Sequence, residues 1–206
     1  MQVNYINQLN DFLLAQKIKA ETNKLQKMLD FLNFLVKWNK TYNLTAITNF
    51  DDMFVFHLLD SLVINPYLHG DNLLDIGTGA GFPAVPISIL NPELAVTALD
   101  SCGKKTRFLT QAKFEFGIDN LNIENVRLED YHTNVKFEHI TARAFASIDK
   151  IINQSTHLML NTGSWILMKG KNPISEIQKL RLQTKVFPVK VPKLDAQRHI
   201  VIVDNK

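Results

Sequence analysis

Two patterns of hydrophobic and polar positions divide the chain near residue 70. In the first part, apolar residues recur at spacings of three and four, which predicts amphipathic helices over residues 4–14, 22–40 and 51–64. The apolar stripe of the second helix is wide, so other elements are expected to cover it. We therefore predict an N-terminal helical extension over residues 1–70, packed on a second domain over residues 71–206.

From residue 72 onward, short segments rich in valine and isoleucine alternate with helical segments. The strand-like segments are 72–76, 94–100, 121–126, 138–144, 164–169, 184–191 and 198–203. This alternation predicts an α/β fold in which helices cover a parallel sheet. The connection between the last two strands is too short for a crossover helix, so these strands are expected to form an antiparallel hairpin at the sheet.

A glycine-rich turn follows the first predicted strand, in the segment Leu-Leu-Asp-Ile-Gly-Thr-Gly-Ala-Gly-Phe-Pro of residues 73–83. Its alternating glycines, Gly77, Gly79 and Gly81, permit positive φ and close approach of a ligand, beside the free N–H groups of a following helix. Asp100, at the end of the second strand, can accept hydrogen bonds from both hydroxyls of a ribose. Together, the loop and the carboxylate predict an adenosine-type cofactor.

Phe82 distinguishes a nicotinamide dinucleotide from other adenosine cofactors. A dinucleotide fingerprint that begins at Gly77 needs glycine or alanine at position 82, and phenylalanine is too large for that packing. A dehydrogenase is therefore the second choice. The Asp-x-Gly-x-Gly-x-Gly pattern instead resembles the first motif of the class I S-adenosylmethionine methyltransferases, which implies that Asp75 and the three glycines surround the methionine part of the cofactor.

Six segments resemble the glucose-inhibited division protein B family, in the same order along the chain. They are 37–47, 57–62, 74–83, 100–105, 141–146 and 198–202. Members of this family are bacterial guanine-N7 methyltransferases of small-subunit ribosomal RNA. The resemblance therefore implies a Rossmann-like class I methyltransferase fold, S-adenosylmethionine as the cofactor, and a guanine in the 530-region loop of 16S rRNA as the target.

The resemblance also implies which residues touch the cofactor. The matching positions are Gly77, Phe82, Leu128, Glu129 and Arg143. In this family Leu128 and Glu129 would meet adenine, and the guanidinium of Arg143 could position the cofactor carboxylate or an RNA phosphate. The alternatives are a solvated loop acid at Glu129 and a structural ion pair of Arg143 with Asp75 or Glu129.

The positive charge lies mainly in the last third of the chain. Residues 1–130 contain 11 lysines and arginines against 15 acidic residues, whereas residues 131–206 contain 12 against 5. A basic region of this kind suits a polyanion such as rRNA, although a solvated lysine-rich surface is the alternative. The leading candidates for contact with RNA phosphates are Lys169, Lys171, Arg181 and Lys185.

The other reactive residues predict neither a metal site nor a nucleophile. Six histidines lack metal-ligand spacing, and Cys102 is the only cysteine of the chain. His57 and Asp60 share a helix face, where a contact between domains is expected, and Trp38 is expected to belong to the core. Guanine N7 carries a free lone pair, so the reaction needs no general base.

The expected environment is the cytoplasm, because the chain has neither a membrane-length apolar run nor a convincing signal peptide. The predicted partners are 16S rRNA, the small ribosomal subunit or an assembly intermediate, with no metal and no membrane, and the protein is expected to be a monomer. Two further alternatives stay open, a small-molecule S-adenosylmethionine methyltransferase and a non-catalytic RNA-binding module. A small-molecule enzyme has no need of the basic stretch from Lys169 to Arg198, whereas a non-catalytic module would bind RNA but release no S-adenosylhomocysteine.

Overall fold

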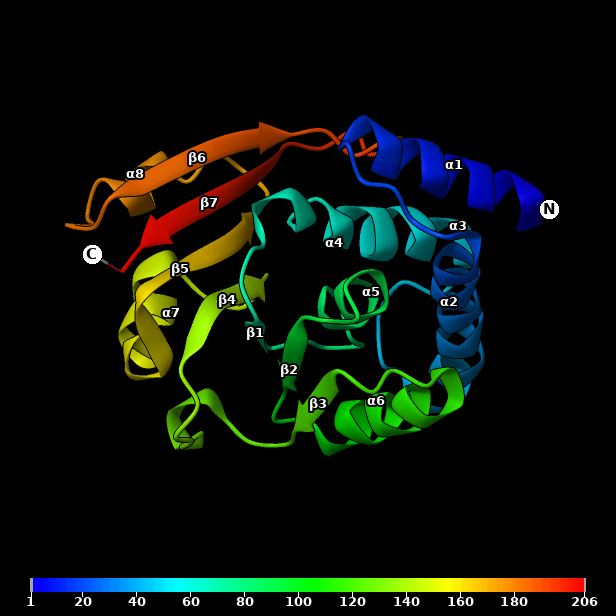
Figure 1. Cartoon of the computed structure of the whole chain (residues 1–206), viewed down its shortest axis with the longest axis horizontal. Coiled ribbons are helices and arrows are strands. Elements are labelled where there is room, and N and C mark those ends of the chain that lie inside the picture. Colours follow the sequence, from blue (N-terminus) through cyan, green and yellow to red (C-terminus); the bar gives the residue numbers. More distant parts are fainter. Residues whose placement is uncertain (1, 206) are drawn as a thin grey trace.

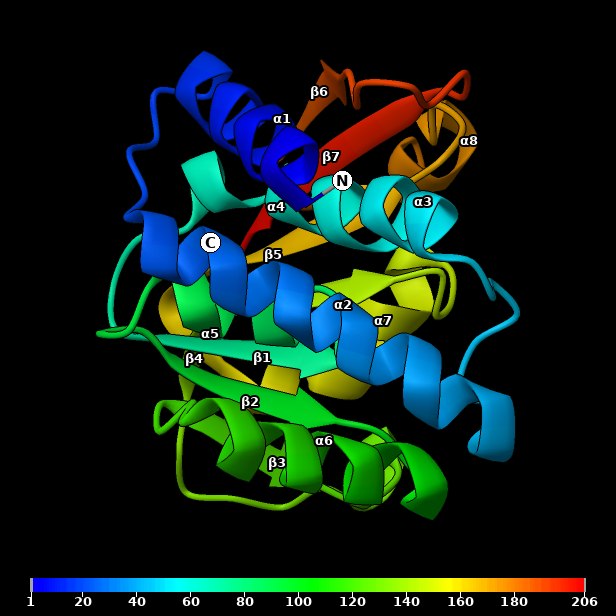
Figure 2. The same ribbon diagram turned by 90° about the vertical axis from the view of Figure 1, so that its right-hand side faces the viewer.

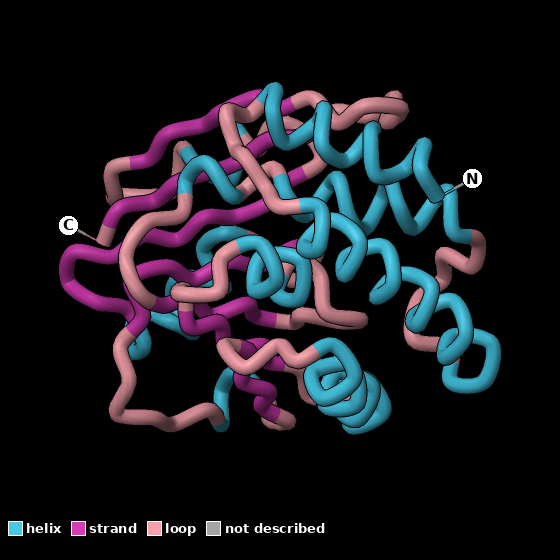
Figure 3. The backbone as a smooth tube through the Cα atoms, turned by 45° about the vertical axis from the view of Figure 1, so that its right-hand side comes forward, coloured by secondary structure: helices cyan, strands magenta, loops and turns pink. Residues whose placement is uncertain are grey.

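The computed structural model describes residues 2–205, and its centre is a seven-stranded sheet (Figure 1). The strands are β1 (Asn72–Ile76), β2 (Ala95–Leu99), β3 (Leu121–Glu124), β4 (Phe137–Arg143), β5 (Met159–Lys169), β6 (Thr184–Val189) and β7 (Arg198–Asp204). They form one continuous layer in the order β3-β2-β1-β4-β5-β7-β6 (Figure 3). β7 runs antiparallel to both of its neighbours, β5 and β6, and the other neighbouring pairs are parallel. The predicted α/β class and the C-terminal hairpin are confirmed.

Helices cover both faces of the sheet (Figure 2). They are α1 (Gln2–Ala15), α2 (Thr22–Tyr42), α3 (Phe50–Asp52), α4 (Asp60–Leu62), α5 (Ala84–Leu90), α6 (Gly103–Phe116), α7 (Ile148–Ser155) and α8 (Ile174–Ile177). The N-terminal helices, α5 and α6 share one hydrophobic cluster with one face of the sheet, and α7 packs in a second cluster on the other face. Within residues 2–205, no helix is both long and apolar enough to cross a membrane.

The predicted helix over residues 51–64 is in fact an irregular helix. It begins at Phe50, passes through a π-helical stretch over Met53–Leu59 and ends at Leu62. A short 3-10 helix, Asn65–Tyr67, follows it. The wider turn was not predictable from apolar spacing alone. π-Helical turns often occur at functional sites, and this one carries side chains that line the cavity described below.

The N-terminal helices help to fix the glycine loop. Phe31 of α2 is buried, and its ring centroid lies 5.5 Å from that of Phe82 and 5.8 Å from that of Phe108 in α6. Trp38 packs on the edge of the same cluster, as predicted. Because the helices and the sheet share a core, we propose that the region of residues 1–70 is an extension of the domain that follows.

Candidate functional site

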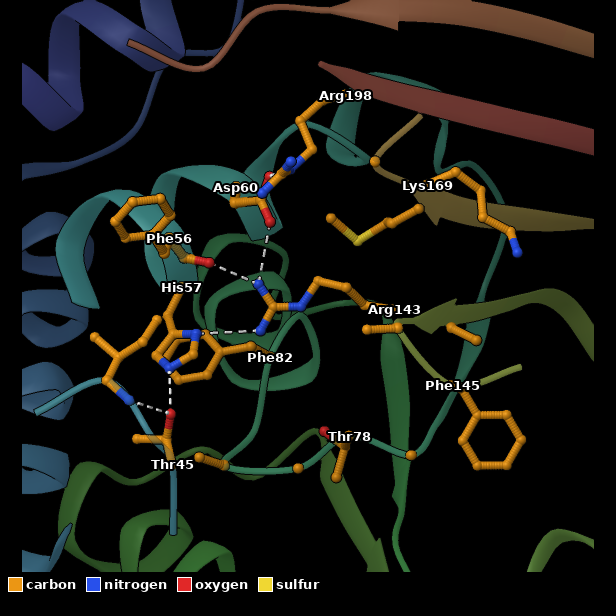
Figure 4. A pocket seen from close by; sticks show the side chains of 18 of the residues that line it. Thr45, Phe56, His57, Asp60, Thr78, Phe82, Arg143, Phe145, Lys169 and Arg198 are labelled. Atoms are coloured by element: carbon orange, nitrogen blue, oxygen red, sulfur yellow. Dashed lines mark hydrogen bonds and ion pairs between the residues drawn. The ribbon is translucent and has the colours of Figure 1, made fainter. Parts of the chain in front are cut away.

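A cavity of about 580 Å³ opens where β1, β4 and β5 end, and Figure 4 shows most of its side chains. Its walls come from the glycine loop after β1, the ends of β4 and β5, the start of β7, and residues between 44 and 60. Ligands of open α/β sheets bind beyond the carboxyl ends of the parallel strands. The cavity therefore lies where this fold class places its ligand.

Backbone hydrogen bonds attach the glycine loop to the end of β2. The N–H groups of Gly77 and Thr78 both donate to the carbonyl oxygen of Leu99, at 2.8 and 3.1 Å. The N–H of Gly79 donates to Oδ2 of Asp100 at 2.9 Å. Asp100 therefore holds the loop in place, a role that the sequence did not predict for it.

The three glycines of the loop serve different purposes. All have positive φ, 69° at Gly77, 64° at Gly79 and 94° at Gly81. A Cβ at Gly81 would lie 2.6 Å from the Leu109 side chain, so this glycine allows close packing in the core. A Cβ at Gly79 would find its nearest neighbour at 3.9 Å. Gly79 is therefore the glycine that leaves room for a ligand.

Asp75 lies completely buried at the end of β1. Its Oδ2 accepts a hydrogen bond from the N–H of Ala84, at the start of α5, at 3.1 Å. Its Oδ1 and the hydroxyl of Thr78 are buried without a hydrogen-bond partner among the residues that the structure describes. Burial raises the pKa of Asp75 to about 6. The ionised form of this carboxylate therefore destabilises the folded state.

Replacing Asp75 by asparagine is expected to remove this destabilisation. Because the folded-state pKa is raised to about 6 from 3.8, the wild type loses stability as the pH rises through this interval. Asparagine keeps an oxygen for the Ala84 N–H and does not titrate. When the pH is raised from 4.5 to 7.5, the unfolding free energy of Asp75→Asn minus that of wild type should increase by on the order of 2 kcal/mol.

Urea unfolding of both ligand-free proteins at the two pH values measures this relative gain. Asp30→Asn on the surface of α2 is a suitable control, because its carboxylate is only half-buried. A difference between wild type and Asp75→Asn that does not change with pH would contradict the prediction.

Arg143, the last residue of β4, is the centre of a hydrogen-bond network in the cavity wall (Figure 4). One terminal nitrogen donates to the carbonyl oxygen of Phe56 at 2.8 Å and to Oδ2 of Asp60 at 3.3 Å. The other donates to Nδ1 of His57 at 3.3 Å. The guanidinium carbon lies 5.8 Å from the ring centroid of Phe82. These contacts fix the orientation of the guanidinium before any ligand binds.

Asp60 is shared between two arginines. Its buried carboxylate accepts from Nε of Arg198, at the start of β7, at 2.7 Å, in addition to its contact with Arg143. The ion-pair partner of Arg143 is therefore Asp60, and not Asp75 or Glu129, the two partners considered from the sequence. A single negative charge faces two positive ones, so the wall of the cavity favours an anionic group.

His57 links Arg143 to Thr45. Its ring stacks on that of Phe82, with centroids 4.7 Å apart, and its Nε2 lies 2.9 Å from Oγ1 of Thr45. Burial, reinforced by the charge of Arg143, lowers the pKa of His57 to about 3. The imidazole is therefore neutral at physiological pH, and its Nδ1 is already occupied as an acceptor. His57 is a contact between the helical extension and the sheet, as expected, and it is not poised to act as a general base.

Comparison with known proteins identifies the family. A model of the GidB family, described as rRNA small subunit methyltransferase G, matches residues 24–201. The chain belongs to this family. A ribosomal RNA small subunit methyltransferase G from Hydrogenovibrio crunogenus is 45% identical over 182 residues, covering 87% of this chain and 84% of the relative. One from Coxiella burnetii is 47% identical over 186 residues, covering 90% and 91%.

Solved structures support the fold independently of sequence. The precorrin-6y C5,15-methyltransferase of Geobacter metallireducens aligns with a TM-score of 0.54 at 14% identity, over 79% of this chain and 91% of that one. At this identity, the likeness concerns the fold alone. The predicted family, the class I methyltransferase fold and the methyltransferase class are confirmed, and with them S-adenosylmethionine as the methyl donor.

The glycine loop fits the cofactor of this family. Gly79 leaves open space beside the backbone, and the buried oxygens of Asp75 and Thr78 still have hydrogen-bonding capacity. Of the predicted cofactor residues, Gly77, Gly79, Phe82 and Arg143 line the cavity. That these four residues contact the cofactor stays a proposal.

The other predicted cofactor residues, Asp75, Gly81, Asp100, Leu128 and Glu129, lie outside the lining of this cavity. Leu128 is buried in the 3-10 helix that follows β3, and Glu129 beside it is exposed and accepts from Gln154 at 2.7 Å. Oδ1 of Asp100 accepts from the N–H of Cys102 at 2.8 Å. A carboxylate has about four acceptor positions, so ribose binding by Asp100 stays a proposal, as does adenine binding by Leu128 and Glu129.

Outside the glycine loop, four polar or charged side chains of the cavity lining were not predicted as site residues. They are Thr45, His57, Asp60 and Arg198. His57 and Asp60 were recognised as neighbours on a helix, but their common partner lies more than eighty residues away. The signal that could have found them was already present, because all four fall inside segments that resemble the family.

The basic residues predicted to contact RNA differ in how they are paired. Lys169 lines the cavity and forms an ion pair with Glu176 at 2.9 Å. Exposed Lys185 lies 3.9 Å from Asp204. Lys171 and Arg181 are exposed and form no ion pair with any residue in the range 2–205. These two therefore have charges free for a polyanion. Within the same range, no group of three or more His, Cys, Asp or Glu could hold a metal ion.

Proposed function

We propose that this protein transfers the methyl group of S-adenosylmethionine to N7 of a guanine in the 530-region loop of 16S rRNA. The observation that carries the proposal is the cavity whose lining joins the glycine loop to two arginines, Arg143 and Arg198, which share the carboxylate of Asp60. Family membership supports rRNA of the small subunit as the substrate.

The arrangement suits a reaction that depends on positioning. S-Adenosylmethionine supplies an electrophilic methyl group on a sulfonium, from which a neutral thioether leaves readily. Guanine N7 supplies the lone pair that accepts the methyl group. The protein therefore has to bind and orient the base and to exclude water, which can contribute several kcal/mol through proximity. Neutral His57, with its pKa lowered to about 3, agrees with a reaction that requires no general base.

The target guanine must leave its stack to react. N7 lies on the edge of the base that faces the deep, narrow major groove of A-form RNA, which side chains do not enter. A cavity of about 580 Å³ beside the glycine loop has room for a displaced base. We propose a single-stranded or looped guanine as substrate, in free 16S rRNA, the small subunit or an assembly intermediate, with a cytoplasmic monomer as the enzyme.

The direct test uses labelled S-adenosylmethionine with 30S particles and with free 16S rRNA, both lacking the modification. Label in RNA, mapped to one guanine and cleaved by chemistry specific for N7-methylguanine, is the expected result. An enzyme for small molecules would leave both RNAs unlabelled. A non-catalytic module would bind RNA without releasing S-adenosylhomocysteine.

RNA binding is expected to depend on the two unpaired cations. Changing Lys171 and Arg181 to glutamine together should flatten the plot of log affinity against log salt by roughly 0.7 to 0.9 for each phosphate contact that is lost. The control is the double change of Lys17 and Lys19 to glutamine, since these exposed lysines belong to the segment between α1 and α2. Filter binding at several salt concentrations measures both slopes. Equal slopes would assign Lys171 and Arg181 to ordinary solvated surface.

A further inference from the structure

The hydroxyl of Thr45 has an unusually well-defined hydrogen-bonding role. Its oxygen accepts from the backbone N–H of Ile47 at 3.2 Å and lies 2.9 Å from Nε2 of His57 (Figure 4). A threonine hydroxyl has two acceptor lone pairs and one hydrogen to donate. Which of these meets His57 depends on the position of the imidazole proton.

Arg143 determines the position of that proton. A guanidinium has only donors, so the nitrogen that points at Nδ1 of His57, at 3.3 Å, requires Nδ1 to be an acceptor. The imidazole is neutral, so its hydrogen must lie on Nε2. Nε2–H then donates to Thr45. Both lone pairs of the hydroxyl oxygen are thereby occupied, and the hydroxyl hydrogen is left to be donated elsewhere.

The hydroxyl hydrogen of Thr45 has no acceptor among the described residues, so a ligand in the cavity is the group that can accept it. Thr45 lines the cavity. Its backbone is also fixed. The side chain of buried Asn39 donates to the Thr45 carbonyl at 3.0 Å and accepts from the Thr45 N–H at 2.9 Å. Thr45 therefore presents a preorganised donor, and it cannot act as an acceptor.

We infer that the Thr45 hydroxyl donates to O6 of the target guanine and thereby selects guanine over adenine. This inference rests on the proposed function. O6 lies beside N7 on the same edge of the base, so a donor there orients guanine and leaves the N7 lone pair free to react. Adenine presents an amino group at this position. That donor would face a hydroxyl whose lone pairs are both occupied.

Arg143 thus acts on specificity at a distance, as a positioning residue. If its guanidinium did not fix the imidazole tautomer, the hydroxyl could turn, donate to His57 and accept from an adenine amino group. Sites with a directed donor reject ligands that lack the matching acceptor more strongly than apolar pockets do, because polar groups are then left unpaired.

The test uses 16S rRNA assembled by splinted ligation, with guanine, inosine or 2,6-diaminopurine at the methylated position. Inosine keeps O6, whereas 2,6-diaminopurine replaces it with an amino group. Wild type should methylate the first two at similar rates and the third roughly 10- to 100-fold more slowly. This comparison needs no protein variant, and equal rates on all three would overturn the inference.

Protein variants assign the effect to Thr45. Thr45→Val should slow transfer to guanine and inosine roughly 10- to 100-fold and leave the rate on 2,6-diaminopurine unchanged, while Thr45→Ser restores the guanine rate. Thr48→Val, at an exposed threonine of the same segment, should behave as wild type. Calorimetry should give the same affinity of Thr45→Val and wild type for S-adenosylhomocysteine.

Three outcomes would oppose the inference, and they differ in meaning. A weaker affinity of Thr45→Val for S-adenosylhomocysteine would assign the hydroxyl to the cofactor. An equal loss of rate on guanine and on 2,6-diaminopurine would show a general defect rather than recognition of O6. If wild type methylated guanine neither in free rRNA nor in 30S particles, the proposed function itself would be overturned.

Discussion

Arg143→Ala is expected to lower kcat/KM for methyl transfer by roughly 100- to 1000-fold, which is the scale for loss of one preorganised charged donor. The change removes donors to Phe56, Asp60 and His57 at once and takes a cation from the cavity wall. Asp60 keeps Arg198 as a partner, so the folded state should lose only about 1 to 3 kcal/mol. Single-turnover assays and thermal unfolding measure the two effects separately.

Two further variants test whether the geometry of Arg143 matters as well as its charge. Arg143→Lys keeps the charge but cannot donate simultaneously to Asp60 and His57 from a planar fork, so its rate should fall between those of wild type and alanine. Lys150→Ala, at an exposed position of α7, removes a cation that lies outside the cavity lining and should leave the rate unchanged. If Arg143→Ala had wild-type activity, Arg143 would have no role in methyl transfer.

The fold was predictable because its signals are local. Short strands rich in valine and isoleucine alternate with helices, and residues 73–83 contain a strand, three glycines and a helix start in a fixed order. The connection before β7 is short, which is why the antiparallel hairpin could be predicted. Where the prediction failed locally, as in the π-helical stretch over Met53–Leu59, tertiary packing determines the backbone rather than apolar spacing.

The site was predictable only as far as its residues belong to a motif. Gly77, Gly79 and Phe82 lie in the glycine loop, and all three line the cavity. Asp60 could not be assigned from local pattern, because a carboxylate on an amphipathic helix looks the same whether it faces solvent or two arginines from other strands. Such a residue gains its role from contacts that are distant in sequence, and only the fold brings these together.

Pairing of charges explains why a basic region does not translate directly into an RNA surface. Lys169 belongs to the basic C-terminal third, yet Glu176 accepts from it and balances its charge beside the cavity. Lys171, two residues later, is exposed and has no such partner among residues 2–205. Counting charges along the chain cannot separate these cases, because the separation depends on which acid the fold places nearby.

Gly79→Val is expected to weaken the binding of S-adenosylmethionine by 100-fold or more, which corresponds to a loss of about 3 kcal/mol of binding free energy. The new side chain would project into the open space that the loop leaves for a ligand. A φ of 64° also opposes a β-branched residue, at a cost of about 1 to 3 kcal/mol in stability. Calorimetry with S-adenosylmethionine and urea unfolding measure the two effects.

Gly117→Val separates strain from occlusion. Gly117 ends α6 with a φ of 55°, and an added Cβ there would have no neighbour within 4 Å. It lies outside the cavity lining, so the variant has comparable backbone strain but nothing to block. We expect both valine variants to lose similar stability and only Gly79→Val to lose cofactor affinity. If Gly117→Val lost as much affinity as Gly79→Val, the defect would come from the destabilised fold, and Gly79 would have no special place beside the cofactor.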